Sequence, residues 1–196
     1  MFDLNELENL IEETFKKREK LNAALAIHYN FEKIREKLIV RLFINLENIL
    51  ITDPLFIGNL IENDFSKKDL DDLNNYEKFS VHIKLLDQNY LICIENQQED
   101  LSHFHLGIRK VKYSQSQNEE LRTAVIDKVG FRFDNEISPW WIVKEENIDI
   151  IRFSGFDTPE ILSDLYSQNS KVLSVISSLF QKLKKVVDDL NSEPKV

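Results

Sequence analysis

Apolar residues recur every three or four positions through the first fifty residues, a spacing typical of amphipathic helices. The first stripe comprises Leu4, Leu7, Leu10, Ile11 and Phe15. The second comprises Ala24, His28, Phe31, Ile34, Leu38, Leu42, Leu46 and Ile49. We expect a break between helices either in the polar run 16–20 or at Tyr29-Asn30. Asp53-Pro54 should end the helical region, because proline disfavours helix in the residue before it.

Three segments between residues 79 and 109 alternate apolar with polar residues, which predicts strands with one buried face. Their apolar positions are Phe79, Val81, Ile83 and Leu85, then Tyr90, Ile92 and Ile94, then Phe104, Leu106 and Ile108. Polar residues at 87–89 and 97–100 separate the segments, so we expect an antiparallel meander.

The last eighty residues carry signals for helix ends. A short helix is predicted over 118–128, with Gly130 as its left-handed stop. Thr158-Pro159-Glu160 combines a cap residue with proline at the first helical position, which predicts another helix start. Short extended pieces are expected at 131–133, 140–143 and 148–153. The final helix has heptad-like apolar positions at Val172, Ile176, Leu179, Leu183, Val186 and Leu190.

These elements predict an α+β fold: N-terminal amphipathic helices, a small antiparallel β-meander, and C-terminal helices packed on one face. We expect one domain over residues 1–191, with a helical part at 1–52, the meander at 77–113 and the C-terminal helices at 158–190. Residues 192–196 are expected to form a disordered tail. The heptad-like seam fits pairing with the N-terminal helices or a homodimer, and the sequence does not choose between them.

Charge and cysteine content narrow the function classes. The chain has 25 Lys and Arg against 34 Asp and Glu, a net charge of −9, so direct binding of duplex DNA is not expected and a basic protein partner fits better. Cys93 is the only cysteine, which excludes an intramolecular disulfide and favours a reducing, cytoplasmic location. The first twenty residues are unlike a signal peptide, and no apolar run approaches membrane-spanning length.

The two tryptophans of the chain are adjacent, in Ser138-Pro139-Trp140-Trp141. Neighbouring residues on a strand point to opposite faces, so one tryptophan can enter a core while the other meets something else. Tryptophan is enriched among interface hot spots. Trp140 and Trp141 are therefore the candidate binding residues; the alternative is that both belong to the core.

One alternative function is a divergent Mg²⁺-dependent nuclease. The run 91–97 resembles the strand that carries Glu and Lys in PD-(D/E)XK nucleases, with Asp87 as the upstream acid, Glu95 in the motif and Gln97 in place of lysine. Both carboxylates would have to reach one Mg²⁺ at roughly 2.0–2.1 Å. If Asp87 lies in the hairpin turn, Glu95 is five residues beyond Tyr90, about 16 Å away at the usual strand rise. This geometry argues against the nuclease.

Another alternative is a metal-dependent hydrolase that uses the polar face of the meander. If the strands pair as the alternation predicts, this face contains His82, Cys93, Glu95, His103 and His105. Imidazole, thiolate and carboxylate groups all bind zinc. The candidate metal ligands are His82, His103 and His105, and the ordinary interpretation is that they are polar residues on a half-covered face.

Four short pieces carry a family resemblance: Phe104-His105-Leu106-Gly107-Ile108, Gly130-Phe131, Trp140-Trp141 and the segment 156–162. Together they resemble the C-terminal accessory region of bacterial PD-(D/E)XK nuclease-superfamily proteins from defence-related and mobile genomic contexts. The resemblance covers roughly residues 78–190. The family's catalytic strands would lie upstream, where this chain is predicted to be helical, so no catalytic residue is carried over. The resemblance implies an accessory or interaction role.

The sequence therefore predicts a non-enzymatic protein-binding module of a bacterium or phage, with a role in defence or counter-defence. No catalytic residue, cofactor or membrane contact is expected in this hypothesis. The alternative is a divergent nuclease or hydrolase that depends on magnesium or zinc.

Overall fold

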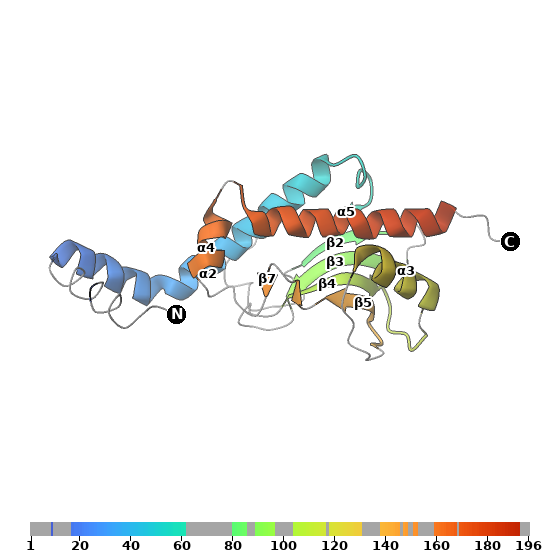
Figure 1. Ribbon diagram of the computed structural model, residues 1–196, viewed down its shortest axis with the longest axis horizontal. Helices are drawn as coiled ribbons and strands as arrows, with labels where there is room; N and C mark the ends of the chain where they lie inside the picture. The colour runs from blue at the N-terminus through green and yellow to red at the C-terminus, as the bar shows by residue number, and fades with distance from the viewer. Residues whose placement is uncertain are drawn as a thin grey trace.

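The computed structural model describes residues 9, 17–61, 80–85, 89–96, 104–116, 118–130, 138–145, 147–148, 151–152, 159–167 and 169–192. Within these residues the chain forms a five-stranded antiparallel sheet, four helices and a separate two-stranded hairpin (Figure 1). The helices are α2 (Arg18–Thr52), α3 (Glu119–Val129), α4 (Pro159–Tyr166) and α5 (Lys171–Ser192). The predicted α+β fold is confirmed.

The main sheet has the strand order β1-β2-β3-β4-β5. Its strands are β1 (Leu60–Ile61), β2 (Ser80–Lys84), β3 (Tyr90–Asn96), β4 (Phe104–Lys110) and β5 (Trp141–Glu145). Strands β2 to β4 are the predicted meander, and β5 covers most of the extended piece expected at 140–143. Strand β1 lies in a stretch that the sequence left unassigned. The small hairpin of β6 (Asn147–Ile148) and β7 (Ile151–Arg152) follows β5.

Helix α2 is 35 residues long, about 52 Å at the usual rise, and it extends well beyond the sheet (Figure 1). Of the two expected break positions, only the polar run 16–20 coincides with a helix boundary, because α2 continues through Tyr29-Asn30. The helix ends at Asp53, as the Asp53-Pro54 pair predicts, and the Asp53 N–H donates to the Ile49 carbonyl. Its first half is largely exposed, whereas the second half contributes Ile39, Leu42, Phe43, Leu46 and Leu50 to the core.

The main core lies between one face of the sheet and helices α2 and α5. The register aligns apolar positions of neighbouring strands, for example Val81 with Ile94 and Ile92 with Ile108. The rings of Phe43 and Phe104, with centroids 5.4 Å apart, join α2 to β4. The heptad-like stripe of α5 contributes Val172, Ile176, Leu183 and Val186 to this core. A homodimer through that seam stays a prediction.

A glycine at the end of α3 and a side-chain cap at the start of α5 fix the ends of these helices. Gly130 ends α3 with a φ of 80°, the left-handed conformation that the sequence predicted for it. Asp164 of α4 caps α5: it accepts from the backbone N–H groups of Lys171 and Val172 at 2.9 and 3.0 Å, and from Ser170 Oγ at 2.7 Å. This cap satisfies donors at the first turn of α5 that have no partner within the helix.

Some predictions concern residues that the structure does not describe. They include every residue of the first apolar stripe, the extended piece at 131–133, and residues 193–196 of the expected tail. Helix α5 itself extends to Ser192, the first residue of that predicted tail. Among the described helices, none is both long enough and apolar enough to cross a membrane.

Candidate functional site

The adjacent tryptophans have different environments. Trp141, on β5, is 6% exposed, and its ring meets the His105 ring edge-on at 5.7 Å. Trp140 directly precedes the strand and is 41% exposed. Ser138 fixes both residues, because its hydroxyl oxygen accepts from the backbone N–H groups of Trp140 and Trp141 at 3.2 and 3.1 Å. One tryptophan is therefore packed inside, and the other presents part of its ring to solvent.

Trp140 belongs to a small exposed aromatic group that we call the Trp140 patch, made of Trp140 and Tyr113. The two rings meet edge-on at 5.6 Å, and Tyr113 is 59% exposed. The backbone beneath the patch is held by Lys110, whose buried Nζ donates to the carbonyl oxygens of Ser114 at 2.7 Å and Ser138 at 3.0 Å. Burial lowers the pKa of the Lys110 ammonium. The patch is thus an exposed surface on a well-anchored turn.

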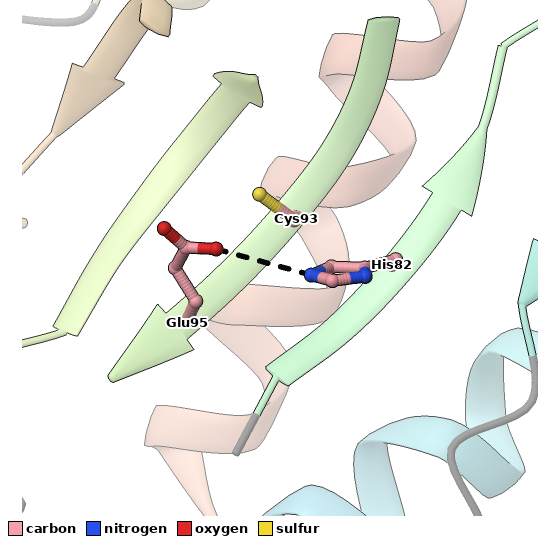
Figure 2. A group of neighbouring side chains, drawn as sticks. All are labelled: His82, Cys93 and Glu95. Carbon is pink, nitrogen blue, oxygen red and sulfur yellow. Dashed lines mark ion pairs between the residues drawn. The ribbon is translucent and has the colours of Figure 1, made fainter. Parts of the chain in front are cut away.

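A second group of side chains lies on the sheet face opposite the main core. Cys93 and Trp141 are buried yet do not belong to the main core cluster, so this face is covered as well. The register places His82 directly across from Cys93, and Glu95 follows two residues later on the same face of β3. Figure 2 shows these three side chains from β2 and β3 gathered together on the sheet.

The three side chains form a compact group of ligand-type atoms, which we call the His–Cys–Glu cluster. One ligand atom from each of His82, Cys93 and Glu95 lies within 4.8 Å of the others. His82 Nε2 is 3.9 Å from Glu95 Oε2, an ion-pair distance that is too long for a hydrogen bond (Figure 2). Among the described residues, nothing forms a hydrogen bond with the buried Nε2 of His82.

Arg109 links the cluster to the Trp140 patch. Its Nη1 donates to Glu95 Oε2 at 3.0 Å, and its guanidinium carbon lies 5.5 Å from the centroid of the Trp140 ring. The second distance is that of a cation–π contact. One cation therefore neutralises a buried carboxylate on one side and supports an exposed indole on the other.

The thiol of Cys93 is not activated as a nucleophile. Burial raises the pKa of Cys93 well above its ordinary value, and the nearby Glu95 carboxylate raises it further, while Arg109 acts in the opposite direction. The protein nucleophile is the thiolate, which needs an exposed, electropositive surrounding. A fully buried thiol beside a carboxylate has neither property.

Of the three residues proposed for the nuclease, only Glu95 is described by the structure, and Asp87 and Gln97 lie outside the described residues. The β2–β3 register places Glu95 opposite Ser80, at the end of the hairpin remote from the segment connecting the two strands. Its carboxylate faces the cation of Arg109 instead of a second acid. The described part of the chain therefore offers no pair of carboxylates at this position.

Of the predicted metal ligands, His82 is in the cluster and His103 lies outside the described residues. His105 is directly opposite Glu95 on β4, but its ring packs against Trp141. Cys93 and Glu95, which the alternation placed on this face, complete the group with His82. Sequence reasoning missed the roles of Arg109 and Tyr113. Arg109 could have been found from its position on the polar side of β4, whereas the contact of Tyr113 has no signal in the sequence.

Comparisons of the chain with protein-family models, curated proteins and solved structures found no match.

Proposed function

We propose that this chain is a protein-binding module whose anchor is the Trp140 patch. The observation that carries the proposal is the combination of a 41% exposed indole with a rigid support beneath it. Tryptophan, tyrosine and arginine are the residues most enriched at binding hot spots. Trp140, Tyr113 and Arg109 bring all three types together through ring and cation–π contacts.

The rigidity of the patch supports the same proposal. A side chain that is already ordered loses less conformational entropy on binding than a mobile one. Trp140 is held by the Ser138 hydroxyl through its backbone, and Arg109 is held by Glu95. Trp141 has a structural role in this proposal, because its ring is enclosed beside His105. We therefore assign the anchor to Trp140 alone of the two candidates.

The partner that we propose is a protein with a basic surface. A net charge of −9 attracts cationic partners over several ångströms and raises the rate of productive encounters. The single, buried cysteine fits a reducing compartment, so we place the interaction in the cytoplasm of a bacterium or phage-infected cell. A defence or counter-defence role, without catalysis, follows from the resemblance to nuclease accessory regions.

The test is capture of partners from a lysate of the source organism with three forms of the purified chain. Wild type is compared with Trp140→Ala and with Tyr166→Ala as the matched control. Tyr166 is also an exposed aromatic under an arginine, with the Arg41 guanidinium carbon 5.7 Å from its ring centroid. We expect one or more proteins to bind wild type and Tyr166→Ala but to be lost with Trp140→Ala.

The captured protein is then titrated against each form. Removing a hot-spot side chain costs about 2 kcal/mol or more, so we expect Trp140→Ala to weaken binding roughly 30-fold. Raising the salt concentration should slow association of the wild type, because it screens the steering charge. Equal binding by wild type and Trp140→Ala, or no partner for the wild type, would refute the proposal.

A further inference from the structure

The His–Cys–Glu cluster is joined to the Trp140 patch through the contact of Glu95 with Arg109, but none of its three residues belongs to the patch. We propose that His82, Cys93 and Glu95 bind a single zinc-type transition-metal ion. The backbone brings the three residues together, because His82 pairs with Cys93 across the strands and Glu95 lies two positions along β3 on the same face. Because the two strands are hydrogen-bonded, the backbone positions of the three ligands are fixed relative to one another before any metal binds.

The distances agree with a tetrahedral site. Zinc binds nitrogen and oxygen at about 2.0–2.2 Å and sulfur at about 2.3 Å, so neighbouring ligand atoms are roughly 3.3–3.6 Å apart. His82 Nε2 and Glu95 Oε2 are already 3.9 Å apart, and the whole group lies within 4.8 Å. Small side-chain rotations, with no movement of the strands, would bring all three atoms to bonding distance.

The buried Nε2 of His82 also indicates a ligand at this position. Buried polar atoms in folded proteins are nearly always satisfied, and each exception requires an explanation. Among the described residues, the Nε2 of His82 has no hydrogen-bond partner, and it points toward Glu95 and the sulfur of Cys93 (Figure 2). A metal ion between the three side chains would satisfy this atom.

The donor set selects the class of metal. A thiolate, an imidazole and a carboxylate suit zinc and similar first-row ions, whereas Mg²⁺ and Ca²⁺ prefer oxygen donors. Binding replaces the S–H bond of Cys93 with a sulfur–metal bond, and the proton passes to solvent. Burial and the Glu95 carboxylate keep this thiol protonated when no metal is bound.

Arg109 has a supporting role at this site. Metal-binding carboxylates are commonly held by a further hydrogen bond, and Arg109 Nη1 supplies one to Glu95 at 3.0 Å. Without metal, the Glu95 carboxylate and the Arg109 guanidinium balance each other beside a neutral thiol; with Cys93 and Glu95 anionic, the dication and the guanidinium leave a single positive charge. The three protein ligands leave one tetrahedral position for water or another small donor.

The experiment uses the full chain after treatment with EDTA. It is titrated with Zn²⁺ in competition with a chromophoric chelator, and separately with Co²⁺ under anaerobic conditions. We expect one Zn²⁺ per chain with a dissociation constant below about 1 µM. The Co²⁺ form should show a sulfur-to-cobalt charge-transfer band and the strong visible bands of tetrahedral cobalt, which directly report the Cys93 thiolate.

Variants assign the ligands. Cys93→Ser should remove the charge-transfer band, and His82→Gln should weaken Zn²⁺ at least 10-fold. His28→Gln, which changes an exposed histidine on α2, should bind as wild type does. Because the cobalt spectrum of the wild type needs no variant, the proposal can be refuted even if a variant fails to fold. Absence of the charge-transfer band, or no stoichiometric Zn²⁺ binding by the wild type, would overturn it.

Discussion

Replacing Arg109 by glutamine removes the cation that faces the buried carboxylate of Glu95. The Glu95 side chain is 11% exposed and the Arg109 side chain 30% exposed, with Nη1 and Oε2 3.0 Å apart. The pair is therefore intermediate between a surface ion pair and a buried one. Removing Arg109 should cost more free energy than breaking a surface ion pair, because the Glu95 carboxylate stays in place, largely out of water.

The expected magnitude follows from these exposures. Exposed ion pairs contribute about 0–1 kcal/mol, whereas removing one partner of a fully buried pair costs about 3–5 kcal/mol. The partial exposure of Arg109 lets water compensate in part, so we expect Arg109→Gln to lower the free energy of unfolding by about 2 kcal/mol. For a chain of this length, that corresponds to a fall of roughly 4–8 °C in the melting temperature.

The assay is a double-mutant cycle of urea unfolding in the presence of EDTA, which keeps metal out of the comparison. The four forms are wild type, Arg109→Gln, Glu95→Gln and the double variant. The double variant should be more stable than the sum of the two single losses predicts, because it no longer contains a buried carboxylate. A change within about 0.5 kcal/mol for Arg109→Gln, or strictly additive losses, would refute this reasoning.

The remaining predictions concern the cap of α5 and the β4–β5 pair. Burial raises the pKa of Asp164, but the hydrogen bonds from Val172, Lys171 and Ser170 outweigh it, so the net pKa is lowered. A carboxyl group whose pKa is lower in the folded state stabilises the fold at pH values above its unfolded pKa of about 3.9. That stabilisation is lost as the pH falls through the folded-state pKa. Asp164→Asn should therefore flatten the loss of stability below about pH 5 in acid titrations followed by circular dichroism, and an unchanged acid profile would contradict the cap. A Cβ at Gly107 would lie 2.0 Å from the Val143 carbonyl oxygen and 2.8 Å from Lys144 Cα. These are backbone atoms of a paired strand, which cannot move aside as a flexible side chain can. Gly107→Ala should therefore destabilise the fold by about 3 kcal/mol or more. Urea unfolding monitored by tryptophan fluorescence would measure that loss, with Gly58→Ala as a control for a glycine whose Cβ meets no neighbour but whose φ is positive; a smaller loss for Gly107→Ala than for Gly58→Ala would refute the close approach.

Local patterns were sufficient to predict most of the individual elements. Alternation predicted β2, β3 and β4 because a strand half-buried in a sheet must place every second residue in the core. Gly130 and Asp53-Pro54 predicted helix ends because their backbone preferences act within a few residues. Strand β1 was not predicted, since two residues are too few to show a period.

The candidate sites were only partly visible in the sequence. Alternation placed His82, Cys93 and Glu95 on one face, and the adjacency of the tryptophans allowed one to be buried and the other exposed, with burial of both left open. Neither pattern indicated that Arg109 would connect Glu95 with Trp140, because Glu95 lies on β3 and Trp140 precedes β5, the two strands that flank β4 in the sheet. The proposed interface therefore depends on the order of β3, β4 and β5, and the metal site on the pairing of β2 with β3, which no short window of sequence contains.

The sequence by itself determined the fold class, the principal strands and helix ends, and the polar face of the meander, because these depend on periods and caps read over a few residues. The tertiary structure alone decided which tryptophan is buried, which cation faces Glu95, and how closely His82 and Cys93 approach. Those outcomes depend on strand register and on what packs over each face. Both are set by contacts between residues far apart in the chain, whose energies are not encoded at any single position.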